Sequence, residues 1–291
     1  MHPAPSVILF TTLSGLGFGF LAFLGAGCLH PASMTAFLLW GLGYALAVGG
    51  LLFSTLHLGN PQRAWRAFSQ WRTSWLSREG WASVVTLLLL PPVALSDWLG
   101  LGWSRLPGMI GAAMCFVTIF TTSMIYAQLK TIPRWNHWIT PVLFLAFSGT
   151  GGAILAGKVW LAVGGCVVLA AVLVAGWRIG DGRFETVGAT MESATGLGSI
   201  GKVRVFERGH TAGNYLLREM IFVVGRKHAA RLRVIALALA AVVPALILLV
   251  AGPHPVAIAL AALCHLIGAM AQRWLFFAEA EHVVGLYYGQ R

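Results

Sequence analysis

The chain has 291 residues, of which 58% are hydrophobic and only 10% are charged, and its net charge is +11 at pH 7. Soluble domains carry about a quarter charged residues, so this composition excludes a soluble fold and indicates a polytopic membrane protein. The basic residues gather in polar stretches between apolar runs. That arrangement is typical of loops that face anionic lipid or the cytoplasm, and it argues against a nucleic-acid partner.

Eight apolar runs are long enough to cross a bilayer. We place these spans at 7–28, 34–56, 82–101, 107–127, 139–157, 159–177, 234–252 and 256–277. The stretches 157–158 and 252–255 contain Gly or Pro and predict turns between spans, whereas Pro91 and Pro92 predict either a kink inside the third span or its early end. The sequence therefore predicts an all-α fold, with a single membrane domain over residues 1–291.

The distribution of Lys and Arg predicts the orientation of these spans. With eight spans, both termini share one side, and 18 of the 20 basic residues then fall on that side, Arg273 among them. The positive-inside rule places that side, and both termini, in the cytoplasm. We therefore expect a multi-pass protein of the bacterial inner membrane.

One long polar loop, 178–233, is predicted on the cytoplasmic side. Its first half is rich in Gly, Ser and Thr and predicts extended coil. Apolar residues between 216 and 224 recur at helical spacing and predict a short amphipathic helix that lies on the membrane surface or against a partner. Near the end of the chain, Glu279, Glu281 and His282 follow the last span, and we interpret them as solvated groups at the interface.

The segment 57–81 is the most informative part of the chain. Residues 1–62 contain no Lys, Arg, Asp or Glu, and this segment then brings His57, four arginines and Glu79 to the edge of lipid. Ionisable groups in that position mark chemistry or docking. His57 ends the second span and Glu79 precedes the third, so we expect both residues at the same membrane face.

A histidine and a partly desolvated carboxyl group form a proton donor–acceptor pair. A quinone needs such a pair, because it arrives through lipid and exchanges two electrons and two protons. We expect Arg63 and Arg78 to stabilise a charged form of the quinone or to pair with Glu79. The alternative is an ion cluster that only fixes the loop.

Other residues inside the spans carry weaker signals. His265 is the only histidine well inside a span, and no second histidine lies at a matching depth for a haem, so we expect it to hydrogen-bond to a neighbouring helix. The four cysteines form no CxxC, which argues against iron–sulfur or zinc ligation by this chain. We interpret four hydroxyl residues of the fourth span as bonding back to carbonyl groups of their own helix: Thr118, Thr121, Thr122 and Ser123. Glycines of the first and fifth spans predict close helix packing: Gly15, Gly17, Gly19, Gly149, Gly151 and Gly152.

Five stretches of the chain resemble the membrane anchor subunit of DMSO-reductase-type molybdoenzyme complexes. They read HLGNPQRAW, LSREGW, KTIPRWNHWITPVLF, YLLREMIFVVGRKHAARLR and RWLFFAEAEHVVGLYYG. The resemblance implies a complex in which a molybdopterin subunit acts on the substrate and an iron–sulfur subunit transfers electrons. It also implies that the anchor holds both subunits, binds a quinone and has no haem. The histidine of HLG and the glutamate of LSREG, here His57 and Glu79, are then associated with quinol binding.

The cytoplasmic charge signature of segment 57–81 favours relatives whose catalytic subunits stay in the cytoplasm, and the sulfite-oxidising complexes look most similar. We therefore expect an anchor that passes electrons between a partner's iron–sulfur cluster and ubiquinone or menaquinone, without itself acting on the substrate. Three alternatives stay open: the anchor of a DMSO, S-oxide or N-oxide reductase that oxidises quinol, a secondary transporter, and a scaffold without a quinone site.

Overall fold

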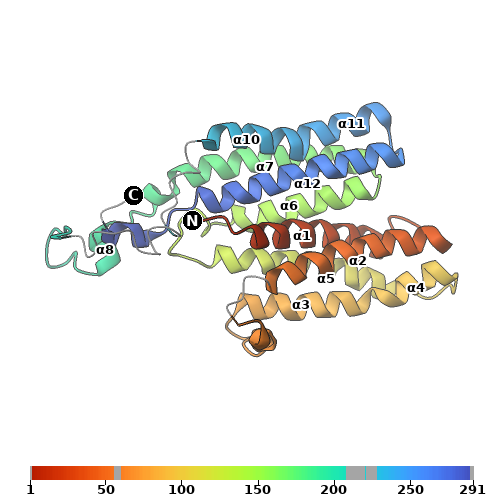
Figure 1. Ribbon diagram of the computed structural model, residues 1–291, viewed down its shortest axis with the longest axis horizontal. Helices are drawn as coiled ribbons and strands as arrows, with labels where there is room; N and C mark the ends of the chain where they lie inside the picture. The colour runs from red at the N-terminus through yellow and green to blue at the C-terminus, as the bar shows by residue number, and fades with distance from the viewer. Residues whose placement is uncertain (1, 56–59, 208–219, 221–227, 289–291) are drawn as a thin grey trace.

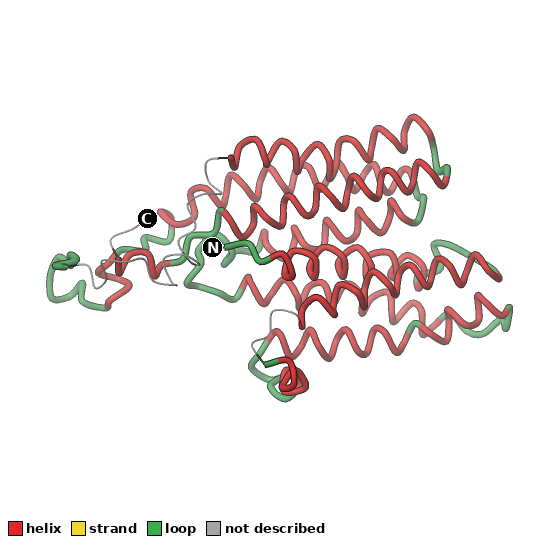
Figure 2. The backbone as a smooth tube through the Cα atoms, viewed as in Figure 1, coloured by secondary structure: helices red, strands yellow, loops and turns green. Residues whose placement is uncertain are grey.

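The computed structural model describes residues 2–55, 60–207, 220 and 228–288, and no strand occurs among them (Figures 1 and 2). The helices, in chain order, are α1 (Pro5–Gly25), α2 (Ser33–Thr55), η1 (Pro61–Phe68), α3 (Trp75–Leu89), α4 (Pro91–Leu99), α5 (Leu106–Ala127), α6 (Ile139–Leu155), α7 (Val159–Thr186), α8 (Met191–Thr195), α10 (Ala229–Leu237), η3 (Ala238–Val242), α11 (Val243–Ala251), α12 (Pro255–Ala278) and η4 (Val283–Tyr288). The all-α prediction is confirmed.

The long helices lie side by side along the long axis of the molecule (Figure 1). Within the described ranges, seven helical segments are long and apolar enough to cross a membrane. They are α1, α2, the α3–α4 pair, α5, α7, the α10–η3–α11 run and α12. The apolar helix α6 has 17 residues and falls short of that length. Each of these eight segments overlaps one of the predicted spans.

The predicted breaks between and within spans are confirmed. The helix α3 ends at Leu89 and α4 begins at Pro91, because the ring of a proline clashes with the carbonyl group one turn earlier. Gly157 separates α6 from α7, and Gly252 separates α11 from α12. Both glycines have positive φ angles, of 63° and 66°, which a residue with a side chain rarely adopts.

Several helices extend beyond the apolar runs into the polar segments. The helix α3 begins at Trp75, seven residues before the predicted start, and α7 continues to Thr186, nine residues past its predicted end. The extended coil predicted after residue 178 is wrong, because α7 and α8 occupy much of it. Arg273, counted among the cytoplasmic basic residues, lies inside α12 and within the predicted span 256–277. Apart from Met220, the amphipathic helix predicted at 216–224 lies outside the described residues.

Glycine packing at α1 is confirmed at most of the predicted positions. A Cβ atom on Gly17 would collide with the backbone of Ala47, and one on Gly19 with the carbonyl group of Ser148. These contacts let α2 and α6 approach the backbone of α1 closely. Gly149 is different, since a Cβ there would meet only the Phe116 ring at 4.0 Å, so a close-packing role for Gly149 is wrong.

A π-helical turn, η3, interrupts the run from α10 to α11. Pro244 has no N–H to donate to Ala240, four residues earlier, and the turn accommodates this missing bond. The freed carbonyl oxygen of Ala240 lies 2.7 Å from Nδ1 of His265 on α12. Nε2 of His265 lies 3.1 Å from the carbonyl oxygen of Phe147 on α6. The predicted hydrogen bonding of His265 to neighbouring helices is confirmed.

The start of α1 and the end of α12 lie at the same end of the bundle, together with α8 (Figure 1). There the Tyr287 hydroxyl group donates to the carbonyl oxygen of Ala194, which joins η4 to α8. The connections after α4 and α11 lie at the opposite end. Among the described residues, the connections between the membrane-length segments therefore lie at the two ends of the bundle, as a bilayer requires (Figure 2).

Candidate functional site

Glu79 lies in the second turn of α3 and is only 4% exposed. The prediction placed it in a loop before the helix. The longer helix instead turns the Glu79 side chain toward α5, in the part of the bundle where α3 and α5 pack together. A carboxyl group at this depth requires a polar partner, because an unpaired one is strongly disfavoured away from water.

Thr122 of α5 supplies that partner. Its hydroxyl oxygen lies 2.6 Å from Oε1 of Glu79 and 2.9 Å from the carbonyl oxygen of Thr118. A threonine hydroxyl has one proton to donate and two lone pairs to accept. It can donate to an ionised Glu79, or accept from a protonated Glu79 while it donates to Thr118. Both protonation states of the carboxyl group therefore have a hydrogen-bonded arrangement.

The predicted bonding of the α5 hydroxyl groups to their own helix is confirmed, but two of these groups also contact side chains of α3. Thr118, Thr121 and Ser123 donate to backbone carbonyl oxygens three or four residues earlier. Thr118 also lies 3.1 Å from the hydroxyl oxygen of Thr86 on α3. A line of hydroxyl groups thus continues the Glu79 contact along the α3–α5 interface.

Arg78 points away from Glu79. Its Nε donates to the carbonyl oxygen of Trp71 at 3.0 Å, and its Nη2 to that of Arg72 at 2.7 Å. The guanidinium carbon lies 4.3 Å from the ring centroid of Trp75. Arg78 therefore holds the loop before α3, and its predicted pairing with Glu79 is wrong.

The other predicted site residues are not brought to Glu79 by the described part of the chain. Arg63 is exposed on η1. His57 lies outside the described residues. The η1 segment itself is fixed to α3, because Nε1 of Trp81 donates to the carbonyl oxygen of Phe68 at 3.0 Å and the two rings meet edge to face.

An apolar groove of about 510 Å³ lies where η1, α3 and α5 meet. Its lining is mainly aromatic and aliphatic: Phe68, Trp71, Arg78, Trp81, Ala82, Val85, Met114, Val117 and Thr121. Trp81, Val85 and Val117 are each at least 40% exposed, so this face of the bundle meets lipid in a membrane. Thr121, in the groove wall, is the chain neighbour of Thr122, and Arg78 is the neighbour of Glu79. Glu79 and Thr122 themselves do not line the groove, but the groove and their contact lie at the same α3–α5 interface.

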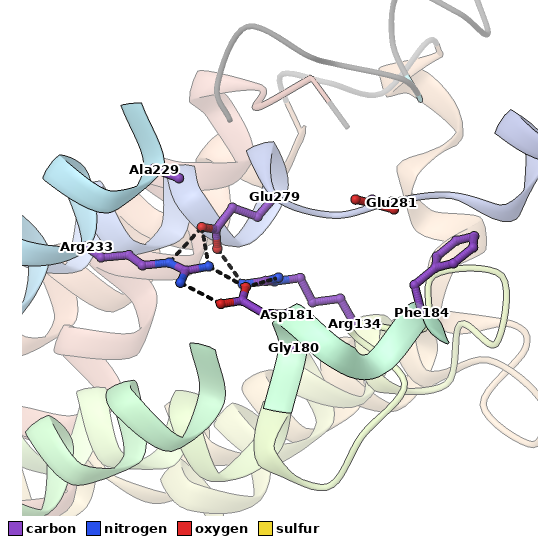
Figure 3. A pocket seen from close by; sticks show the side chains of 8 residues that line it. All are labelled: Arg134, Gly180, Asp181, Phe184, Ala229, Arg233, Glu279 and Glu281. Atoms are coloured by element: carbon purple, nitrogen blue, oxygen red, sulfur yellow. Dashed lines mark hydrogen bonds and ion pairs between the residues drawn. The ribbon is translucent and has the colours of Figure 1, made fainter. Parts of the chain in front are cut away.

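A second polar cluster lies at the same end as the chain termini (Figure 3). Arg134 bonds to Asp181 at 3.0 Å and to Glu279 at 2.6 Å. Arg233 bonds to Glu279 at 2.7 Å and also pairs with Asp181. Two cations and two anions thus alternate around a cavity of about 210 Å³. Glu279 is only 7% exposed, so its interpretation as a solvated group is wrong.

Among the described residues, no group of three or more His, Cys, Asp or Glu side chains is arranged to hold a metal ion. His137 lies between α5 and α6, and His282 follows α12. Burial, followed by the positive charge of Arg183, lowers the pKa of His137. Burial also lowers the pKa of His282.

Comparison with known proteins places this arrangement in a family. Residues 2–289 match the family model of the DMSO reductase anchor subunit (DmsC). The chain belongs to the DMSO reductase anchor family. It is also similar to a sulfite dehydrogenase subunit of Allochromatium vinosum, with 30% identity over 324 aligned positions that cover 99% of each chain. The family resemblance inferred from the sequence is confirmed.

Two features of this anchor protein were not predicted from the sequence. Thr122 was recognised only as part of a polar patch, since a local bond to Thr118 explained it. The groove is assembled from residues 68–85 and 114–121, and no local pattern links these two stretches. The hydroxyl groups gathered within an otherwise apolar span were the available signal for a buried polar partner.

Proposed function

We propose that this chain anchors a molybdenum and iron–sulfur oxidoreductase to the bacterial inner membrane. In this proposal it passes electrons between the partner's iron–sulfur cluster and the quinone pool during cytoplasmic sulfite oxidation. The observation that carries the proposal is the buried Glu79–Thr122 contact at the α3–α5 interface, where a lipid-facing groove also lies. Membership of an anchor family across the whole chain supports an anchor rather than a transporter.

The groove fits a quinone in size and chemistry. Pockets that enclose a small organic ligand measure about 300–1,000 Å³ and are mostly apolar with a few polar groups. This one has about 510 Å³, aromatic walls, and Arg78 and Thr121 as polar groups. A bound quinone supplies two-electron, two-proton chemistry. In this chain, Trp71 and Trp81 would hold the ring, while Arg78 would fix the loop that closes the groove.

Glu79 is the group that we assign to proton exchange. Its side chain accepts or releases a proton without losing its hydrogen bond, because Thr122 serves as donor or acceptor. His57, which matches the histidine of the family motif, is proposed to exchange protons with the cytoplasm. Arg63 is proposed to add positive charge at the same face.

Sulfite is proposed as the substrate of the whole complex. The full-length similarity to a protein of a sulfite dehydrogenase supports this choice over a DMSO or N-oxide reductase. Ferredoxin-like and molybdopterin subunits are the proposed partners. We assign their docking surface to the polar end of the bundle, including segment 178–233 and the Trp-rich segment 57–81.

We also propose eight crossings with both termini in the cytoplasm. The helix α6 spans about 26 Å at 1.5 Å per residue, which approaches the hydrocarbon thickness of about 30 Å. The start of α1 and the end of α12 lie at one end of the bundle (Figure 1), and this arrangement supports an even number of crossings. Counting α6 as a crossing gives that even number.

The decisive experiment replaces Glu79 with Gln in the assembled complex. We expect sulfite-dependent reduction of a short-chain ubiquinone to be lost, while sulfite oxidation with ferricyanide and the amounts of all subunits stay unchanged. His57→Gln should behave in the same way, and Lys158→Gln, at an exposed position between α6 and α7, serves as the control. Undiminished quinone reduction in Glu79→Gln would exclude this site.

A further inference from the structure

A cleft of about 490 Å³ lies where the end of α5, the start of α6 and the end of α7 meet. The connection between α5 and α6 lies at the end of the bundle that carries α8 (Figure 1). The lining of this α5–α6–α7 cleft includes Met124, Asn136, His137, Trp138, Pro141 and Arg183. None of these residues lines the groove at α3 or the cavity of the ion cluster. The proposed function therefore does not use the cleft.

The polarity of the cleft changes with depth in the membrane. Met124 lies three residues before the end of α5 and Pro141 two residues after the start of α6, so both belong to the apolar part of the bundle. His137 and Trp138 lie in the connection between these helices, whereas Arg183 lies six residues beyond the predicted span 159–177. Trp138 is 63% exposed, as expected for an indole ring at the membrane–water interface. This order of groups matches an amphiphile, with its chain in the bilayer and its polar head at the interface.

His137 supplies a hydrogen-bond donor to the cleft. Its Nδ1 accepts from the backbone N–H of Ile139 at 3.2 Å. Burial, followed by the positive charge of Arg183, lowers the pKa of His137, so the ring is neutral at pH 7. A neutral imidazole carries its proton on the nitrogen that does not accept, which is Nε2 here. That N–H group is available to an acceptor on a ligand.

Arg183 gives the cleft a positive charge. Its Nε is buried, and no acceptor among the described residues bonds to it. Asp181, two residues earlier on α7, pairs instead with Arg134 and Arg233 in the ion cluster. Residues two positions apart do not face each other on a helix. Within the described part of the chain, no Asp or Glu side chain lines the cleft, so its electrostatic complement is an anion.

Two classes of amphiphile reach such a cleft from the bilayer, namely quinones and phospholipids. Met124 follows the groove residue Thr121 by three positions on α5, so a quinone is the obvious competitor. A quinone is neutral, however, and brings no charge to Arg183. An anionic phospholipid brings phosphate oxygens that accept from guanidinium and imidazole groups, and acyl chains for the apolar wall. Charge therefore favours the phospholipid.

We propose that the α5–α6–α7 cleft binds one anionic glycerophospholipid, whose phosphate group contacts Arg183 and His137 and whose acyl chains lie along Met124 and Pro141. Asn136 supports the polar wall, because its Nδ2 donates to the carbonyl oxygen of Ala127 at 2.6 Å. The bound lipid joins the end of α7 to the α5–α6 connection. This inference does not depend on the quinone site.

Lipid binding to the purified complex tests the proposal, measured by native mass spectrometry during titration with phosphatidylglycerol or phosphatidylethanolamine. We expect the wild type to bind phosphatidylglycerol about fivefold more tightly, because its net negative charge complements Arg183. Arg183→Gln should raise the Kd for phosphatidylglycerol about tenfold and remove this preference. Arg183→Lys should retain most of the affinity. Arg178→Gln, exposed on the same helix and outside the cleft, is the matched control and should change nothing.

Two further variants test the other walls of the cleft and decide the matter if Arg183→Gln does not assemble. His137→Asn keeps an oxygen that can accept from Ile139 but removes the Nε2 donor, so the Kd for phosphatidylglycerol should rise about threefold. Met124→Trp fills the apolar part of the cleft and should raise the Kd for phosphatidylglycerol about tenfold. Wild-type affinity in both variants would overturn the proposal.

Three other results would overturn it as well. Equal affinity of the wild type for the two lipids would remove the argument from charge. Equal losses in Arg183→Gln and Arg178→Gln would mean a diffuse attraction to the basic surface and not a site. Displacement of phosphatidylglycerol from the complex by a short-chain ubiquinone, with Met124→Trp abolishing both, would assign the cleft to a quinone.

Discussion

Thr122 and Glu79 meet across the α5–α3 interface with 2.6 Å between the hydroxyl and carboxyl oxygens. The two residues are 43 positions apart in sequence, and both are nearly inaccessible to solvent. Within the described residues, the hydroxyl group of Thr122 is the hydrogen-bond partner that holds the Glu79 carboxyl group. The effect of removing this contact on quinone turnover distinguishes a role of Glu79 in proton exchange from a purely structural role.

Thr122→Val keeps the shape of the side chain and removes the hydroxyl group. We expect quinone turnover to fall about tenfold, because Glu79 loses the group that serves both of its protonation states, a change worth about 1.4 kcal/mol. Thr122→Ser should retain most of the activity. Ser123→Ala is the matched control, since that hydroxyl group bonds only to its own helix. Steady-state quinone reduction in membranes provides the measurement, and equal effects of Thr122→Val and Ser123→Ala would contradict the role of the Glu79 contact.

Filling the groove should impair quinone turnover without affecting assembly. Val85 lines the groove, whereas Leu88, 70% exposed on the same helix, does not. We expect Val85→Trp to raise KM for a short-chain ubiquinone about tenfold, because the larger ring occupies the space needed by the ligand. Leu88→Trp should leave KM unchanged. If both variants have the wild-type KM, quinone binds elsewhere.

The span pattern was predictable because apolar length is a local property. Residues 1–62 contain no ionic side chain, and the turns at Gly157 and Gly252 follow from residue types at single positions. The start of α3 was not predicted, because it depends on contacts with residues outside the helix. Arg78 and Glu79 marked a loop by their charge, but partners on the preceding loop and on α5 allow both to lie within a helix.

The polar contacts of the site join residues that are far apart in the chain, so the local sequence gives little indication of them. Glu279 was interpreted as solvated because its arginine partners, Arg134 and Arg233, lie 145 and 46 residues away. Arg273 was counted among the cytoplasmic basic residues, although it lies on the Phe144 ring of another helix and near Phe276 of its own. In each case the side chain's neighbours, and not its own segment, determine whether the charge is buried.

The ion cluster around Glu279 should contribute substantially to stability. Glu279→Gln leaves Arg134 and Arg233 without a shared, buried counter-charge, and we expect a loss of about 3 kcal/mol in unfolding free energy. Asp181 is 49% exposed at its side chain, so Asp181→Asn should cost only about 1 kcal/mol. Thermal unfolding of the purified complex in detergent compares the two variants. Similar losses in both would mean that burial does not set the strength of these pairs.

The proposed orientation can be tested with single cysteines in a variant that lacks the four native ones. Ile200→Cys lies in the loop after α8, and Ser104→Cys lies before α5 at the opposite end of the bundle (Figure 1). A membrane-impermeant maleimide should label Ser104→Cys in spheroplasts and Ile200→Cys only in inverted vesicles. The reverse pattern would place segment 57–81 outside the cytoplasm and remove the argument for cytoplasmic sulfite oxidation.

His265 and Pro244 should be coupled through a single carbonyl group. Pro244 has no N–H to donate to the carbonyl oxygen of Ala240, and Nδ1 of His265 lies 2.7 Å from that oxygen, so the tautomer with a proton on Nδ1 donates to it. His265→Leu should therefore destabilise the protein by about 2 kcal/mol, the cost of a buried acceptor left unpaired. Adding Pro244→Ala restores a backbone N–H that can reach Ala240, so the double variant should regain much of the loss. Thermal unfolding of the four proteins measures the coupling, and purely additive effects would mean that His265 is retained for a reason other than the broken helix.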